Sequence, residues 1–287
     1  MKVLWAVDVL ESHPKAIKSM SRFLKSLQSR APLKVDAVSV VYSSETPSAT
    51  EKKEAQDLLN ARLGSTRREK WFSRSHVIFE SQIPQRVAVM DLIEFAQKGN
   101  YEVIVAVKHS KVGRKRAYLG SFAEMLAFLS PIPLFLVNPD GEIPKAIQKM
   151  LVATDASLAC SRDFGKLSQF ISLKGASILL HHRIPYVFPS RTTPRDQELF
   201  RKSETKRATD CLAAVEEIAK QSGATTEKTI KQESGSTEDS ILRSAKKEKS
   251  HLIVLTHKGK GAIGFFLGRI TRRVLQNADR PVLLFRT

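Results

Sequence analysis

Short apolar runs alternate with amphipathic stretches along the whole chain. The runs VIVAV (103–107) and LIVL (252–255) show no alternation of apolar and polar positions. Such uninterrupted runs are typical of parallel strands that helices cover on both faces. Repeated alternation of such strands with helices predicts an α/β fold: an open, doubly wound parallel sheet with right-handed crossovers.

The pattern predicts five strands and four helices in each half of the chain. In the first half we expect strands at residues 2–8, 34–42, 76–81, 102–107 and 133–137, and helices near 12–29, 50–70, 85–98 and 121–129. In the second half we expect strands at residues 149–155, 176–183, 225–232, 251–256 and 281–286, and helices near 158–172, 194–221, 237–248 and 269–277.

The two halves of the chain repeat one another. KVLWAVD (2–8) and KMLVATD (149–155) are both apolar runs that end in Asp, and SPIPLFLV (130–137) matches ADRPVLLF (278–285). The spacing between these landmarks stays close to 148 residues. A constant spacing of this kind indicates a tandem repeat of one structural unit.

The repeat predicts two tandem domains, each with an open five-stranded parallel sheet. We place the first domain at residues 1–138 and the second at residues 149–287. The segment between them, NPDGEIPKAIQ (138–148), contains two prolines and a glycine and is typical of a linker.

The composition is that of a soluble globular protein, with 42% hydrophobic and 26% charged residues. The start of the chain does not resemble a secretory signal, and the most apolar stretch (121–137) is too short to span a membrane and carries Glu124. Cys160 and Cys211 lack the spacing of metal or redox motifs. We therefore expect a cytoplasmic protein without a metal site and without a membrane partner.

The net charge of +18 raises the question of a nucleic-acid partner. Most basic residues lie among acidic ones on the predicted helices. The segment KHSKVGRKR, Lys108 to Arg116, is denser, with five positive charges in nine residues. It is either a site for nucleic acid or another polyanion, or a solvated basic loop.

The stretch THKGKGAIGFFLGRIT near the C-terminus contains the spacing G-x-G-x-x-G, which begins at Gly259. A dinucleotide-binding loop follows the first strand and is followed about 20 residues later by an acidic residue. This loop follows the fourth strand and lacks that acidic residue. A phosphate-binding P-loop is excluded too, because Phe265 and Phe266 stand where Lys and Ser or Thr are required.

The sequence predicts no catalytic residue. It contains no H-E-x-x-H motif, no G-x-S-x-G motif and no paired carboxylates at a recognisable spacing. Slow hydrolysis of ATP is the most that we expect by way of enzymatic activity.

A glycine loop, then Gly268 before a helix, offers backbone N–H groups and a helix N-terminus to an anion. With the first strands that end in Asp8 and Asp155, this arrangement resembles the universal stress protein family. In that family a loop G-x-x-G, nine residues, then Gly-Ser/Thr holds the ribose and phosphates of ATP or AMP. The resemblance covers both halves and implies an adenine nucleotide alpha hydrolase-like fold.

The resemblance also implies the residues that bind the nucleotide. In the second half they are Asp155, His182, Gly259, Gly268, Arg269 and Thr271, and in the first half Asp8, Gly120 and Ser121. The ligand would be ATP or AMP, with or without Mg²⁺, and the second half is the expected site. Arg269 replaces the family's Ser or Thr and would either plug the pocket or clamp a phosphate. The adjacent His181 and His182 point to opposite faces of a strand, so they cannot share one metal ion.

The resemblance favours a stress-response protein in which nucleotide binding acts as a sensor or switch. The alternative is a ligand-free interaction module, or one associated with nucleic acid, whose loops no longer bind nucleotide. Domains of this family pair through their last strands, so we expect residues 133–137 to pair with residues 281–286. The particle would then be a pseudo-dimeric monomer or a homodimer of such chains.

Overall fold

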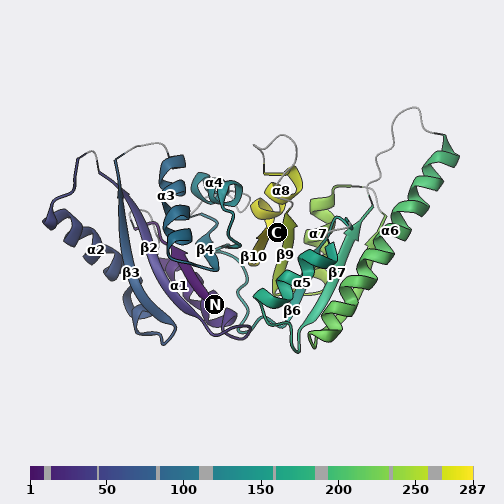
Figure 1. The fold of residues 1–287 in the computed structure, drawn as a ribbon, viewed down its shortest axis with the longest axis horizontal. Helices are drawn as coiled ribbons and strands as arrows, with labels where there is room; N and C mark the ends of the chain where they lie inside the picture. The colour runs from purple at the N-terminus through teal and green to yellow at the C-terminus, as the bar shows by residue number, and fades with distance from the viewer. Residues whose placement is uncertain are drawn as a thin grey trace.

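A computed structural model gives the fold of the chain (Figure 1). It describes residues 1–9, 14–43, 45–81, 85–109, 119–157, 160–184, 193–232, 235–257 and 267–286. Within these residues ten strands form one continuous sheet in the order β3-β2-β1-β4-β5-β10-β9-β6-β7-β8. The expected α/β architecture with two similar halves is confirmed.

The strands are β1 (Lys2–Ala6), β2 (Lys34–Tyr42), β3 (Phe72–Glu80), β4 (Val103–Val107), β5 (Leu134–Val137), β6 (Lys149–Ala153), β7 (Ser177–Arg183), β8 (Thr225–Lys231), β9 (Leu252–His257) and β10 (Val282–Arg286). The helices are α1 (Pro14–Leu27), α2 (Ala49–Leu63), the 3₁₀ helix η1 (Gly64–Arg68), α3 (Gln85–Lys98), α4 (Ser121–Leu129), α5 (Cys160–Phe170), α6 (Pro194–Gln221), α7 (Thr237–Lys247) and α8 (Arg269–Asn277).

Helices cover both faces of the sheet, and each face has its own core. The first core contains Phe23 of α1 and Phe164 of α5 together with residues of α2 and α6. The second core contains Leu92 of α3 and Ile241 of α7 together with residues of α4 and α8. Within each half all strand pairs are parallel. This two-sided burial explains the uninterrupted apolar runs of the central strands.

The two halves meet where β5 pairs antiparallel with β10. Phe135 lies opposite Leu283, and the neighbouring pairs are Leu134 with Leu284 and Leu136 with Val282. Phe135 and Leu283 are 148 residues apart, which is the spacing of the repeat, so each faces its own counterpart. A pseudo-two-fold axis therefore passes through this pair, and the expected pairing of the last strands is confirmed.

Polar contacts reinforce this seam between the halves. Glu124 of α4 forms an ion pair with Arg272 of α8, with 2.7 Å between Oε1 and Nε. Buried Arg30 donates from Nη1 to the carbonyl oxygen of Lys174 in the second half, at 2.8 Å. Glu124 and Arg272 are also 148 residues apart. Two counterpart positions thus carry opposite charges and contact each other.

Several details differ from the expected pattern. The third strand starts at Phe72, four residues before its predicted start, and α2 ends at Leu63 because Gly64 takes a positive φ of 52°. A disulfide joins Cys160 of α5 to Cys211 of α6, with their Cα atoms 6.6 Å apart. Their spacing in the sequence gave no indication of that bond.

Two further expectations concern the chain as a whole. No helix among the described residues is both long and apolar enough to cross a membrane. The domain limits 1–138 and 149–287 and the oligomeric state remain predictions.

Candidate functional site

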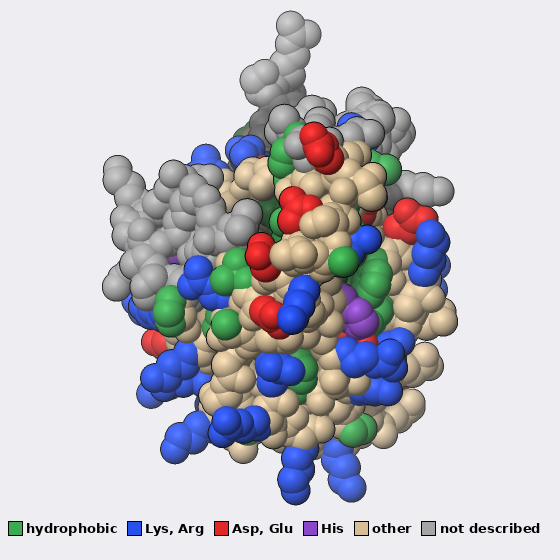
Figure 2. Space-filling model, turned by 90° about the vertical axis from the view of Figure 1, so that its left-hand side faces the viewer, with side chains coloured by type: hydrophobic (Ala, Val, Ile, Leu, Met, Phe, Trp, Pro, Cys, Tyr) green, Lys and Arg blue, Asp and Glu red, His purple; other side chains and the backbone are tan. Residues whose placement is uncertain are grey.

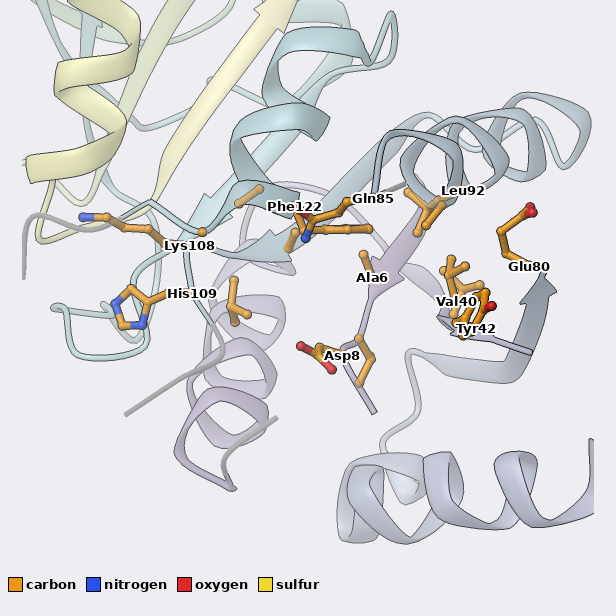
Figure 3. Close-up of a pocket in the computed structure, with 17 residues that line it drawn as sticks. Ala6, Asp8, Val40, Tyr42, Glu80, Gln85, Leu92, Lys108, His109 and Phe122 are labelled. Carbon is orange, nitrogen blue, oxygen red and sulfur yellow. The ribbon is translucent and has the colours of Figure 1, made fainter. Parts of the chain in front are cut away.

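A pocket of about 410 Å³ lies in the first half, at the carboxyl ends of β1 and β4 (Figure 3). β1 pairs with β2 on one side and with β4 on the other, so the strand order reverses at this point. Open α/β sheets bind their ligands at such a crevice. The polar lining residues are Asp8, Tyr42, Glu80, Gln85, Lys108 and His109, and the apolar ones include Val38, Val40, Leu92, Ala106 and Phe122.

Asp8 and Gly120 bring an acid and a helix N-terminus to this pocket. Asp8 follows β1 and is exposed. Gly120 is the N-cap of α4, and its amide donates to the carbonyl oxygen of Lys108 at 2.9 Å. This bond ties the start of α4 to the end of β4. Ser121 is exposed in the first turn of α4, where free backbone N–H groups attract anions.

Lys108 and His109 connect the pocket to the seam between the halves. Only 2% of Lys108 is exposed, and its Nζ donates to the carbonyl oxygen of Gln276 in α8. Burial lowers the pKa of Lys108 from 10.5 to about 8. Nε2 of His109 lies 4.0 Å from Oδ2 of Asp140. Figure 3 shows the side chain of Lys108 extending away from Asp8, so its charge serves the seam more directly than the pocket.

Two carboxyl groups lie together at the end of β3. Glu80 lines the pocket, and Asp91 of α3 stands beside it. A hydrogen bond with Glu80, followed by burial, raises the pKa of Asp91 to about 6. The pair therefore holds a proton at mildly acidic pH. Within the described part of the chain no group of three or more His, Cys, Asp or Glu residues is arranged to hold a metal ion.

The predicted residues of the second half are only partly placed. Asp155 is exposed after β6, and its Oδ1 accepts from the amide of Ser157 at 2.9 Å. Gly268 caps α8, which places Arg269 and Thr271 in the first turn of that helix. Gly259 lies outside the described residues. So does the basic segment Lys108–Arg116 beyond its first two residues.

Counterpart positions show how the second half differs from the pocket. Ala6 pairs with Val38 in the first half, and its counterpart Ala153 pairs with His181 in the second. Val38 and His181 therefore occupy the same place in the two sheets. Two residues further along each strand, Val40 corresponds to Arg183.

Arg183 and His181 direct their polar groups toward α7. Arg183 is buried and donates from Nη1 to Oγ1 of Thr237 at 3.0 Å. Nε2 of buried His181 lies 3.2 Å from Oγ of Ser240. Strand β9 lies on the other side of β6, and there Leu255 occupies the position that Ala106 of β4 has in the first half. Three positions that line the pocket in the first half thus carry larger side chains in the second.

His182 lies on the opposite face from His181, as the sequence predicted. It is buried, and its Nδ1 is 2.9 Å from the carbonyl oxygen of Thr154. Its side chain therefore lies on the opposite face of β7 from that of Arg183. The counterpart of Arg183, Val40, lines the pocket in the first half. The structure does not place the His182 ring where a base would lie on that face.

Sequence reasoning missed several pocket residues, notably Tyr42, Glu80 and Gln85. Tyr42 and Glu80 are the last residues of β2 and β3, and Gln85 opens α3. These residues could have been found from the rule that ligands bind beyond the carboxyl ends of parallel strands. No motif marks these positions, because each comes from a different segment of the chain.

The fold consists of two tandem, doubly wound α/β units. The pocket is a ligand crevice at the point where the strand order of the first unit reverses. The sequence model of the universal stress protein family matches residues 146–286. Residues 146–286 therefore form a domain of this family. A comparison with curated proteins gave no match.

Solved structures extend the similarity to the whole chain. A universal stress protein from Archaeoglobus fulgidus DSM 4304 is 15% identical, covers 99% of this chain and 96% of its own length, and has a TM-score of 0.61. A functionally unknown protein from Pseudomonas aeruginosa PAO1 is 15% identical over 99% and 92% of the two chains, with a TM-score of 0.60.

A shorter relative resembles only part of the chain. The family protein from Arabidopsis thaliana, solved with AMP bound, is 22% identical over 48% of this chain and 91% of its own, with a TM-score of 0.36. At these identities the whole-chain matches show that both halves share the fold.

Proposed function

We propose that the protein binds an adenine nucleotide, ATP or AMP, in the pocket of its first half. The observation that carries the proposal is the pocket itself, which joins Asp8, an apolar wall and the N-terminus of α4 at the switch point of the sheet. Its volume of about 410 Å³ falls within the range of small-molecule sites. The family match of the second half, whose fold the first half shares, supports the same ligand class.

Each part of the pocket suits one part of a nucleotide. Asp8 accepts hydrogen bonds from the ribose hydroxyls, as a carboxylate does strongly. The amide of Ser121 and the N-terminus of α4, which begins there, receive a phosphate. Val38 and Val40 provide an apolar wall for the base. In this proposal nucleotide binding acts as a sensor or switch in a cytoplasmic stress response.

The second half is the weaker candidate, although the sequence favoured it. Gly268, Arg269 and Thr271 are available to a phosphate at the start of α8. On the base side, however, Arg183 and its bond to Thr237 replace the apolar wall. A base would have to displace a buried, hydrogen-bonded guanidinium, which is costly.

Calorimetry with ATP, ADP and AMP tests the proposal on the whole protein. Asp8→Ala should weaken binding by about 1–3 kcal/mol, the cost of unpaired hydrogen-bonding groups. The matched variant Asp155→Ala changes the counterpart residue and should bind as wild type does. If none of the three nucleotides gives heat with the wild-type protein, the proposed function is refuted. Loss in Asp155→Ala alone would move the site to the second half.

A further inference from the structure

One end of the molecule carries a surface of positive charge away from the pocket. It is formed by exposed side chains of α1 and of the segment from the end of α2 to the start of β3, and we name it the basic face. Its residues are Lys18, Arg22, Lys25, Arg62, Arg67, Arg68 and Lys70. Figure 2 looks at this end of the molecule and shows Lys and Arg gathered over its lower part, with acidic residues mainly higher up.

The two segments of the basic face lie side by side. Leu59 and Leu63 of α2 pack with Phe23 and Leu27 of α1 in one core. Across the surface Nζ of Lys25 is 2.6 Å from Oε1 of Glu69. Charges from two separate parts of the sequence are therefore brought onto one continuous surface.

Acidic residues are almost absent from the segments that form the basic face. Residues 14–35 contain no Asp or Glu, and residues 58–70 contain only Glu69. Glu69 is itself paired with Lys25. An ordinary solvated helix surface interleaves both signs of charge, as α2 does with Glu51, Lys52, Lys53 and Glu54. The basic face departs from that composition.

The chemistry of the basic face fits phosphate groups spread along a backbone. Four of its seven cations are Arg, whose planar guanidinium pairs with phosphate through two hydrogen bonds. Leu58 is the only exposed large apolar side chain of the described residues in these two segments. A membrane-bound surface needs a broad apolar face, and a protein interface needs an apolar centre. Neither is present here.

We propose that the basic face binds the phosphate backbone of duplex nucleic acid without sequence specificity. Single strands are held by aromatic side chains on which the bases stack, and no exposed aromatic side chain lies among these residues. The net charge of +18 adds long-range attraction. The face lies over α1 and η1, whereas the pocket lies toward α3 and α4, so both can be occupied at once.

Fluorescence anisotropy with a labelled DNA duplex of arbitrary sequence tests this on the whole protein, over a series of salt concentrations. The variant Arg62→Gln/Arg67→Gln/Arg68→Gln removes three charges of the face. Each lost phosphate contact should lower the slope of log affinity against log salt by about 0.9. We expect weaker binding at every salt concentration and a flatter slope.

The matched control is Lys166→Gln/Lys246→Gln/Lys247→Gln, which removes three exposed charges from the second half. It should retain the wild-type slope. Equal losses in both variants would show that net charge alone attracts the duplex, and would overturn the proposal. Absence of wild-type binding at low salt would overturn it as well, even if anionic vesicles bind. Circular dichroism confirms that each variant is folded.

Discussion

Gly120 lines the pocket at a position where a side chain would meet the backbone. A Cβ atom there would lie 3.3 Å from the carbonyl oxygen of Lys108, against backbone at the pocket rim. Gly120→Val should therefore lower nucleotide affinity at least about tenfold, ~1.4 kcal/mol, by calorimetry. Gly268→Val is the matched control, since no heavy atom of the described residues lies within 4 Å of a Cβ at that position. A larger loss in the control would place the nucleotide in the second half.

Asp91 should give the stability of the protein a distinct pH dependence. Its pKa is raised from 3.8 to about 6, chiefly through Glu80. Between pH 3.8 and about 6 the folded state binds more protons than the unfolded state. The stability that protonated Asp91 contributes is therefore complete below pH 4 and is lost as the pH rises through 6. Asp91→Asn should thus stabilise the fold near pH 7 by about 1 kcal/mol, allowing for solvent screening, and have no such effect at pH 4.

Urea denaturation at several pH values measures this difference. Asp57→Asn removes an exposed carboxylate of α2 and serves as the control for charge alone. If Asp91→Asn raises the free energy of unfolding equally at pH 4 and pH 7, or if the control does so too, the pKa shift that Glu80 causes does not explain the effect.

Among the elements, α5 and α6 are joined by a disulfide between the two cysteines of the chain. The bond closes a loop with a sequence separation of 51 residues, so it restricts the unfolded chain. Reduction should destabilise the protein by about 2–4 kcal/mol. Thermal unfolding with and without a thiol reductant measures the loss. Cys160→Ala/Cys211→Ala should unfold near the temperature of the reduced wild type and show no response to reductant.

Most elements could be predicted because the chain repeats its pattern and the central strands are buried on both faces. Helix α6 (Pro194–Gln221) matches its expected limits because Thr193 and Asp196 form a capping box and Pro194 opens the helix. The disulfide could not be predicted, since cysteines on two helices meet only through the packing of those helices. The sequence named Asp8 and Gly120 of the pocket but favoured the second half, because the correspondence of Arg183 to Val40 depends on the strand registers.

At the scale of the whole molecule, Glu124 and Arg272 form an ion pair between the two halves. Both side chains are partly exposed, so the pair is worth about 0.2–1 kcal/mol. Glu124→Arg should cost slightly more, because two Arg side chains then meet. The swap Glu124→Arg/Arg272→Glu should recover most of the loss. A double-mutant cycle of unfolding free energies measures the coupling, and additive effects would refute the contact.

The meeting of counterpart positions at the seam has a genetic consequence. In a symmetric dimer of identical chains one codon specifies both residues at such a position, so an Arg introduced on one side necessarily appears on the other. A gene that encodes both halves in one chain lifts this restriction. Glu can then face Arg across the axis, and Arg183 can occupy a place that remains Val40 in the other half. A single substitution can thus alter one crevice and leave its twin intact.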